Sequence, residues 1–398
     1  MSDTPSPRDI ESAWTGCPTW LVNNPTRLIA EPVTDAQEEI FWLYTRKQAD
    51  SSTSNSTGLG FINDKTDVLH LTLEISDPLT NHDQHQHDYN IKSTRRKHAS
   101  SLKPKASVVA DTVVQLELYQ DLDALRHRKG DTGSVLWRVS SHFAQYLIST
   151  GRFPQLATTS LICPQDRHRL TLLELGSGTG GLGILLSSQF KHWTFTDQQI
   201  NLNLISKNLK HNGITNSPLL RDDKVLTKTS SSTLKSLTSK QQQNIKSLTK
   251  SSSNLKQLTN TSIEELDWQV ESNIYIKQQG QSEFRRSMSS ESSPPPDIIL
   301  AVDCLYNPHL SPCLAHTIDN KAGKDTVVIV ISELRDSEPL ESFLNTWLQI
   351  RSTTTTTTNT NEMEWNVVRV EFSNEWSSGI GSHQCVVWVG WRRNTDVE

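Results

Sequence analysis

The residues with the clearest chemical potential form a glycine-rich turn that follows an apolar segment. Leu172–Leu175 is apolar except for Glu174, and Gly176, Gly178 and Gly180 follow at every second position. Glycine accepts a left-handed backbone and lets the main chain approach a ligand closely. The apolar residues after the turn suit a helix, whose start offers free N–H groups and the positive end of a dipole. The pattern therefore predicts a ligand site in the first βα turn of an α/β domain.

Two kinds of ligand suit this turn, and Glu174 distinguishes them. Gly176, Gly178, Gly181 and Gly183 fit the G-x-G-x-x-G fingerprint of dinucleotide-binding domains. The acidic-x-G-x-G-x-G pattern that starts at Glu174 resembles motif I of the class I S-adenosylmethionine (SAM) methyltransferases. A carboxylate there would repel a diphosphate, whereas it would attract the sulfonium and α-ammonium of SAM. An ordinary glycine-rich turn without a ligand is the third interpretation.

Acidic and aromatic side chains follow the ends of later predicted strands. Asp197 lies 23 residues after Glu174 and suits the hydroxyls of a ribose or the N-cap of a helix. Trp268 suits adenine stacking or a place in the core. Asp303 and Tyr306 suit the crevice where such folds bind ligands, or an N-cap and a packing tyrosine.

Alternating strands and helices from residue 170 onward would position these side chains. The predicted strands are Leu170–Leu175, Trp193–Thr196, Ser262–Leu266, Ile298–Val302, Thr326–Ile331, Glu364–Phe372 and Gln384–Trp391. The predicted helices between them are Leu182–Phe190, Gln198–His211, Pro308–Ile318 and Glu338–Ile350. This order predicts an α/β fold with a doubly wound, mostly parallel seven-stranded sheet and an antiparallel C-terminal hairpin.

The chain divides into two predicted parts. Residues 1–133 form an N-terminal extension with small α+β elements: a helix starting at Thr34–Asp35 and strands at Phe61–Ile75 and Ser107–Leu118. Residues 134–398 form the second domain, which begins with an amphipathic helix at Ser134–Ile148. Five polar segments, 49–57, 80–105, 217–262, 278–296 and 352–361, are expected to be unstructured.

Composition excludes several classes of protein. The 398 residues carry a net charge of −5, so the surface as a whole does not favour nucleic acid or an anionic membrane. We find no signal peptide, and the apolar runs are too short to span a bilayer. The five scattered cysteines indicate reduced thiols in the cytoplasm or nucleus, and none has zinc-ligand spacing, so we expect no metal. We expect a monomer.

The segment 221–262 has its own charge pattern. It carries seven Lys and one Arg against two Asp. The simplest interpretation is a solvated loop. The alternative is a tether that makes weak contact with RNA.

Taken together, the motifs resemble the seven-β-strand protein-lysine methyltransferases of methyltransferase family 16, whose hallmark is D-x-x-Y after the fourth strand. The resemblance is carried by Gly133–Trp137, Glu174–Gly180, Asp197, Leu266–Trp268 and Asp297–Tyr306, and covers most of 110–215 and 262–391. The sequences around Asn307–Pro308 and Gly379–Trp391 look most like the fungal ribosomal lysine methyltransferases.

The resemblance implies SAM as cofactor and a large-subunit ribosomal protein as substrate. The residues that it places against the cofactor are Trp137, Glu174, Gly176, Ser177, Gly178, Gly180, Asp197, Trp268 and Val302. Asp303 and Tyr306 would be catalytic, shaping the lysine channel, with Asp303 capturing and orienting the amine.

Four alternatives remain open on sequence grounds. They are methylation of another protein or an N-terminus, methylation of a small molecule, SAM binding without turnover, and NAD-linked oxidoreduction. Glu174 disfavours the last, and we see no His or Tyr-x-x-x-Lys arrangement suited to hydride transfer. The long inserts depart from the family pattern, and they affect the placement of Trp268.

Overall fold

The computed structural model describes residues 13–22, 28–50, 60–63, 65–75, 112–127, 132–214, 260–279, 294–355, 360–372, 376, 379–382 and 384–394. The predicted polar segments 80–105 and 221–259 lie outside these residues, as do most of 49–57 and 278–296. Within the described part, no helix has the length and apolar character needed to cross a membrane.

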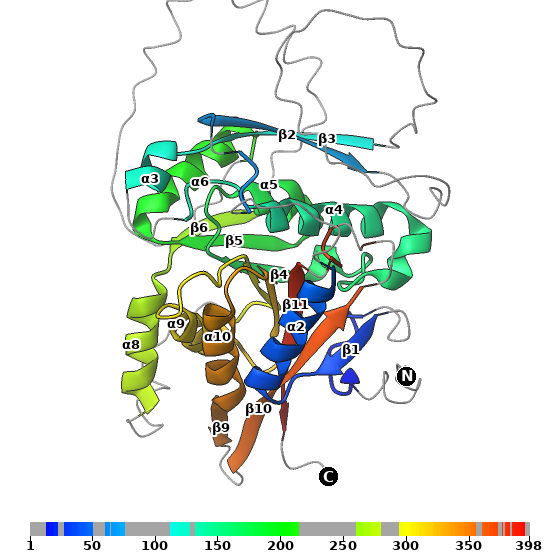
Figure 1. Ribbon diagram of the computed structural model, residues 1–398, viewed down its shortest axis with the longest axis vertical. Coiled ribbons are helices and arrows are strands. Elements are labelled where there is room, and N and C mark those ends of the chain that lie inside the picture. Colours follow the sequence, from blue (N-terminus) through cyan, green and yellow to red (C-terminus); the bar gives the residue numbers. More distant parts are fainter. Residues whose placement is uncertain are drawn as a thin grey trace, which may run out of the picture.

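Nine strands of the described chain form the central sheet (Figure 1). They are β1 (Ile29–Pro32), β4 (Thr171–Leu175), β5 (His192–Asp197), β6 (Thr261–Glu265), β7 (Ile298–Val302), β8 (Val327–Glu333), β9 (Arg351–Thr355), β10 (Thr360–Glu371) and β11 (Cys385–Asn394). The order is β1-β10-β11-β8-β7-β4-β5-β6, with β9 paired to β10. In chain order, the seven predicted strands are therefore arranged 3-2-1-4-5-7-6.

The predicted α/β fold is confirmed. Strands β4, β5, β6, β7 and β8 pair in parallel, and β11 and β10 add antiparallel pairs. Strand β7 is buried along its whole length, as expected for a parallel strand covered on both faces. The strand order reverses between β4 and β7, so the crevice at their carboxyl ends is where a ligand is expected.

Helices cover both faces of the sheet, as Figure 1 shows. One face carries α4 (Arg138–Arg152), α5 (Gly181–Leu186) and α6 (Gln199–His211). The other carries α2 (Ala36–Asp50), α8 (Trp268–Gln279), α9 (Ser311–Lys321) and α10 (Ser337–Gln349). The hairpin of β2 (Val68–Ile75) and β3 (Thr112–Tyr119) packs outside the first layer, followed by α3 (Leu122–His127). Short 3-10 turns lie at Pro154–Thr159, Arg167–Arg169 and Ser187–Gln189.

The predicted unstructured segment 352–361 is partly wrong. Strand β9 and the start of β10 pair antiparallel there, with Ser352 opposite Met363. Threonine is β-branched and favours extended backbone, so a polar threonine run can lengthen a hairpin even though its composition resembles a loop.

Two further boundaries differ from the sequence predictions. Helix α4 begins at Arg138 rather than near Ser134, because Trp137 has extended backbone (φ −89°, ψ 144°). Strand β2 begins at Val68, while Phe61 makes an isolated bridge to Trp137 instead. Both differences leave irregular backbone next to the glycine-rich turn.

Candidate active site

The glycine-rich turn brings three strand ends together. Gly176 has a left-handed backbone with φ +65°. A Cβ on Gly176 would lie 3.0 Å from the Cys304 Sγ and 3.1 Å from the Trp268 ring. The thiol comes from the loop after β7 and the indole from the start of α8, so the turn after β4 needs glycine to fit between them. The structure thus places predicted residues Gly176 and Trp268 side by side.

The amides of the turn are mostly committed to protein acceptors. The Ser177 N–H donates to the Thr196 carbonyl at 2.9 Å, and the Gly180 N–H donates to the Ser177 carbonyl at 2.7 Å. The Gly178 N–H donates to Asp197 Oδ2 at 2.8 Å. These three donors are therefore not offered to a diphosphate. This geometry disfavours the dinucleotide interpretation.

Asp197 ends β5 and ties the turn to α6. Its Oδ1 accepts hydrogen bonds from the Gln198 N–H at 2.8 Å and from Asn201 Nδ2 at 2.9 Å. The side chain is buried beside the turn. The aspartate thus binds the backbone and a side chain at the start of α6, but the N-cap residue is Gln198 and makes no side-chain cap, so the N-cap interpretation of Asp197 is wrong. Its contact with ribose stays a prediction.

Glu174 has a different environment from the one that the sequence argument assumed. It is 4% exposed, and its Oε2 accepts a hydrogen bond from Trp193 Nε1 at 2.8 Å. Burial raises the pKa of Glu174 to about 8, because desolvation penalises the carboxylate and the nearby Asp197 adds to that penalty. Near neutral pH the group is therefore largely protonated until a cation approaches. Glu174 would attract SAM only if the positive charge of SAM lowers the pKa of Glu174, so that the carboxyl group loses its proton.

The loop before α4 lies between the glycine-rich turn and the side chain of Arg335. A Cβ on Gly178 would lie 2.9 Å from the Gly133 carbonyl oxygen, so the two backbones pack closely. Trp137 Nε1 donates to the Thr132 carbonyl at 2.8 Å, which holds the indole in place. The other side of this indole faces the guanidinium of Arg335, whose Cζ lies 4.7 Å from the ring centroid.

Asp303 is the unusual residue of the site. Among the described residues it alone has a positive φ (60°) without being glycine. Its N–H donates to the Ile331 carbonyl at 2.7 Å. Its carboxylate receives Arg335 Nη1 at 2.8 Å and Nη2 at 2.5 Å, and the Glu333 N–H at 3.3 Å. A left-handed aspartate costs backbone energy and persists only where surrounding contacts impose it, which is typical of functional sites.

The sequence analysis missed the partners of Asp303. Arg335 Nη2 also lies 3.0 Å from Glu333 Oε2, and Arg138 Nη2 lies 2.9 Å from Glu333 Oε1. The reasoning that identified Asp303 from its place after a strand could also have identified Glu333 and Arg335. Glu333 and Arg335 are charged residues directly after the apolar run of β8, at the same edge of the sheet.

The remaining predicted residues border this region. Val302 is the last residue of β7 and is buried. Tyr306 follows Asp303 by three residues and is 36% exposed, so it lies where an incoming group could reach it. The contact of Val302 with the cofactor and that of Tyr306 with the substrate stay predictions.

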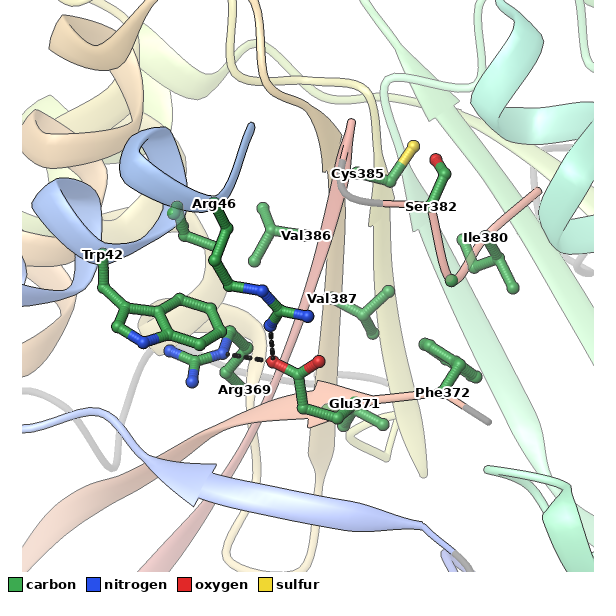
Figure 2. A pocket seen from close by; sticks show the side chains of 13 residues that line it. Trp42, Arg46, Arg369, Glu371, Phe372, Ile380, Ser382, Cys385, Val386 and Val387 are labelled. Carbon is green, nitrogen blue, oxygen red and sulfur yellow. Dashed lines mark hydrogen bonds and ion pairs between the residues drawn. The ribbon is translucent and has the colours of Figure 1, made fainter. Parts of the chain in front are cut away.

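A pocket lies between α2 and the C-terminal strands β10 and β11 (Figure 2). It encloses about 380 Å³, part of it open to solvent. Cys385, in its wall, lies opposite Glu333 in the β8–β11 register. The guanidinium Cζ atoms of Arg46 and Arg369 lie 4.3 and 3.6 Å from the centroid of the Trp42 ring. Glu371 accepts from both guanidinium groups, and Arg369 also pairs with Glu39, so each cation of this pocket has an acidic partner.

The residues present fit SAM better than a diphosphate. Ionisable residues at the ends of β4, β5 and β7 are acidic: Glu174, Asp197 and Asp303. Three carboxyl groups at these strand ends suit a ligand with sulfonium and ammonium groups better than a diphosphate, although burial raises the pKa of Glu174 and Arg335 pairs with Asp303. Gly176 leaves room for main-chain contact, and the indole of Trp268 supplies a flat apolar wall. Within the described residues, no group of three or more His, Cys, Asp or Glu side chains converges on a point that could hold a metal.

Three solved structures are similar to parts of the chain at low identity. The N-methyltransferase NodS from Bradyrhizobium japonicum, in complex with S-adenosyl-L-homocysteine, is 9% identical with a TM-score of 0.32, over 69% of this chain and 98% of that one. A SAM-dependent methyltransferase from Clostridium acetobutylicum is 10% identical with a TM-score of 0.28, over 68% and 97%. Magnesium protoporphyrin IX methyltransferase from Synechocystis, with bound SAM, is 9% identical with a TM-score of 0.29, over 68% and 90%.

Sequence comparison finds a curated relative and a family. Diaminohydroxyphosphoribosylamino-pyrimidine deaminase from Schizosaccharomyces pombe is 27% identical over 234 residues, which are 58% of this chain. The match spans 41% of that protein, so its activity does not transfer to this chain. The sequence model of the lysine methyltransferase family matches residues 118–226 and 237–349, more than half of the chain. These segments contain the glycine-rich turn, Asp197, Trp268, Asp303 and Arg335, and the chain belongs to the lysine methyltransferase family.

Proposed function

We propose that this protein transfers a methyl group from SAM to a lysine side chain of a protein, and that its substrate is a large-subunit ribosomal protein. The observation that carries the proposal is the position of Asp303. It is a strained, buried acid at the carboxyl end of β7, next to the strand-order reversal and to an exposed tyrosine. Family membership supports methyl transfer, and the sequence around Asn307–Pro308 motivates the ribosomal substrate.

SAM is the cofactor that the family implies. Gly176, Ser177 and Gly178 would line it with main chain, Asp197 would accept from its ribose, and Trp268 would contact its adenine. Gly180, Trp137 and Val302 would complete the lining. When bound, SAM supplies a methyl group that is already activated by its sulfonium.

The protein's own task is to prepare and align the amine. A free lysine has a pKa near ~10.4, so only on the order of 10⁻³ of it is neutral at cytosolic pH. A desolvated channel beside Tyr306 would lower that pKa, since burial disfavours the ammonium. Asp303, fixed by its ion pair, would orient the amine toward the methyl group. Alignment to about 3–3.5 Å supplies much of the rate enhancement in such transfers.

Labelled SAM tests the proposal directly. The purified protein is incubated with methyl-tritiated SAM and fungal cell extract, and the labelled band is hydrolysed and mapped by mass spectrometry. We expect methyl-lysine in a large-subunit ribosomal protein. Label at an α-amino group or in a small molecule would support one of the alternative methyltransferases. Stabilisation by NAD but not by SAM in a thermal-shift assay would overturn the proposal.

We also propose that the protein acts as a monomer in the cytoplasm or nucleus, where ribosomal proteins are made and assembled. Size-exclusion chromatography with light scattering and microscopy of a tagged chain test the two statements. A stable dimer or a secreted product would contradict them.

A further inference from the structure

Four charged side chains form a chain of ion pairs around Asp303. Arg335 binds the Asp303 carboxylate through two N–H groups, at 2.8 and 2.5 Å, and also binds Glu333 at 3.0 Å. Arg138, at the start of α4, binds the other oxygen of Glu333 at 2.9 Å. Two acids and two guanidinium groups sum to zero charge, so Asp303 does not present a free negative charge.

The surroundings hold Arg335 in this position. Its guanidinium faces the Trp137 ring at 4.7 Å. A Cβ on Gly60 would collide with the same guanidinium and with Glu333, so the Gly60 backbone packs directly on the pair. The Gly60 carbonyl accepts the Arg138 N–H at 2.8 Å. The Asp303 side chain is 1% exposed and that of Arg335 is 27% exposed, so the acid is covered and the cation lies on the outer side.

The other titratable groups near the cluster leave its balance largely unchanged. The Cys385 thiol is neutral because burial, together with Glu333, raises its pKa to about 12. Burial also raises the pKa of the Cys304 thiol, and burial beside Arg138 lowers the pKa of His142 to about 4. Lys47 of α2 donates to the Leu334 carbonyl, and burial lowers its pKa while the nearby Glu333 raises it. Glu174, Asp197 and Tyr306 border the cluster from the ends of β4, β5 and β7.

The zero net charge of these four side chains matters for lysine methylation, because the amine must be held in place and must also lose its proton. A free carboxylate next to the amine would stabilise the ammonium and hold the nucleophile in its unreactive form. We propose that Arg335 is a positioning residue that fixes and neutralises Asp303, so that the methyl-transfer position carries no net negative charge and lysine is received without stabilising its ammonium. The inference rests on the proposed function, since it takes Asp303 to lie beside the transferred methyl group.

Two cofactor analogues can measure the charge at that position without a protein substrate. Sinefungin carries a primary ammonium where SAM carries its sulfonium methyl, whereas S-adenosylhomocysteine carries a neutral thioether there. The ratio of their dissociation constants, from calorimetry near neutral pH, therefore reports the local potential. In Arg335→Met, the exposed carboxylate should tighten sinefungin relative to S-adenosylhomocysteine by about fivefold or more. In Glu333→Gln, which leaves an excess cation, the ratio should shift in the opposite direction.

The controls separate the possible failures. Arg335→Lys keeps a cation and should keep a ratio within about twofold of the unaltered protein. If the unaltered protein binds neither analogue, the proposed function fails. If S-adenosylhomocysteine binds normally to Arg335→Met and Glu333→Gln but the ratio is constant, the role of Arg335 is overturned. Arg335→Met could misfold and lose all binding. In that case the ratio of dissociation constants in Glu333→Gln, compared with that of the unaltered protein, tests the role of Arg335. A purely structural role would not weaken the binding of sinefungin selectively.

Discussion

At the scale of single residues, Asp303 combines a strained backbone conformation with a buried carboxylate. Its left-handed φ of 60° places the carboxylate between β7 and β8, where Arg335 and the Glu333 N–H hold it. An asparagine tolerates the same backbone, whereas alanine does not. The position therefore offers a pair of substitutions that separates charge from geometry.

Asp303→Asn and Asp303→Ala should both reduce methyl transfer by roughly 100-fold or more, because neither leaves an ionised group to orient the amine. In Asp303→Asn, which tolerates the same backbone, binding of S-adenosylhomocysteine should change by less than about threefold, since Asp303 is assigned to the lysine and not to the cofactor. Single-turnover transfer and calorimetry provide the two readouts. Equal losses in both would show that the assigned role is wrong.

Glu174 makes a prediction about pH. Its pKa is near 4.5 in an unfolded chain and about 8 in the folded protein, so folding takes up a proton between these values. The free energy of unfolding should therefore fall as pH rises from about 4.5 to about 8. Glu174→Gln, which can still accept from Trp193, removes this dependence and should be more stable by on the order of 2–4 kcal/mol near pH 8.

Urea unfolding at about pH 5 and about pH 8 measures the effect of Glu174→Gln. The matched control is Glu265→Gln on the exposed end of β6, which should leave the pH dependence unchanged. A parallel pH dependence for Glu174→Gln and the unaltered protein would contradict a raised pKa at Glu174.

Several site residues could be predicted because each follows a recognisable strand. Gly176 and Trp268 were each expected after the end of a strand, but β5 lies between β4 and β6 in the sheet, so their contact emerges only from the folded structure. The raised pKa of Glu174 could not be predicted, because it comes mainly from burial of the carboxyl group in the folded sheet. The role of Arg335 could not be predicted either, because it depends on which acidic side chain lies next to Arg335 in the folded protein.

At the scale of elements, the glycines around the turn have different tasks. Gly176 needs its left-handed backbone, whereas Gly183 lies within α5 and faces the rings of Phe195 and Trp193. The second half of the apparent dinucleotide fingerprint therefore reflects close packing of α5 on β5. A pattern of glycines alone could not distinguish a ligand contact from a packing contact.

Gly183→Ala should lower the free energy of unfolding by about 1–3 kcal/mol through overpacking against Phe195. Gly176→Ala should instead weaken S-adenosylhomocysteine binding by about tenfold or more, because backbone strain of about 1–2 kcal/mol and contact with Trp268 distort the turn. Gly379→Ala is the control, since its nearest neighbour atom, in His142, would lie 3.8 Å away. Thermal unfolding and calorimetry distinguish the effects, and identical profiles for the first two variants would refute the distinction.

Element types were predicted well where apolar periodicity was long, as in Gln198–His211 for α6. Boundaries were missed where tertiary contacts override local preference. The extended backbone at Trp137 is fixed by Phe61 and Arg335, which are remote in sequence. The β9–β10 hairpin was missed because its threonines are polar, although their backbone preference is extended.

At the scale of the whole molecule, the basic segment 221–262 lies mostly outside the described residues, between α6 and β6. We propose that it contacts RNA, as its excess of lysine suggests. Replacing Lys224, Lys228, Lys235, Lys240, Lys246, Lys250 and Lys256 by glutamine should weaken binding to a ribosomal RNA fragment by about tenfold or more at low salt. Binding of S-adenosylhomocysteine should be unchanged. Anisotropy titrations that show equal RNA affinity for both proteins would rule the contact out.

The N-terminal elements are part of the main sheet and its helical cover. Strand β1 pairs with β10, so that Ala30 lies opposite Val370. Glu39 of α2 accepts from Trp388 Nε1 at 2.9 Å and pairs with Arg369. The predicted boundary at residue 133 therefore does not separate these elements from the central sheet, although the boundary itself stays a prediction.

The pairing of β1 with β10 also constrains biosynthesis. A ribosome makes β1 roughly 340 residues before its partner strand β10. At about 5–20 residues per second, β1 waits on the order of 20–70 s before its partner emerges. During that interval the nascent chain exposes an unpaired strand together with the apolar face of α2. Products that end before β10 should therefore bind chaperones or be degraded more readily than chains that contain β10.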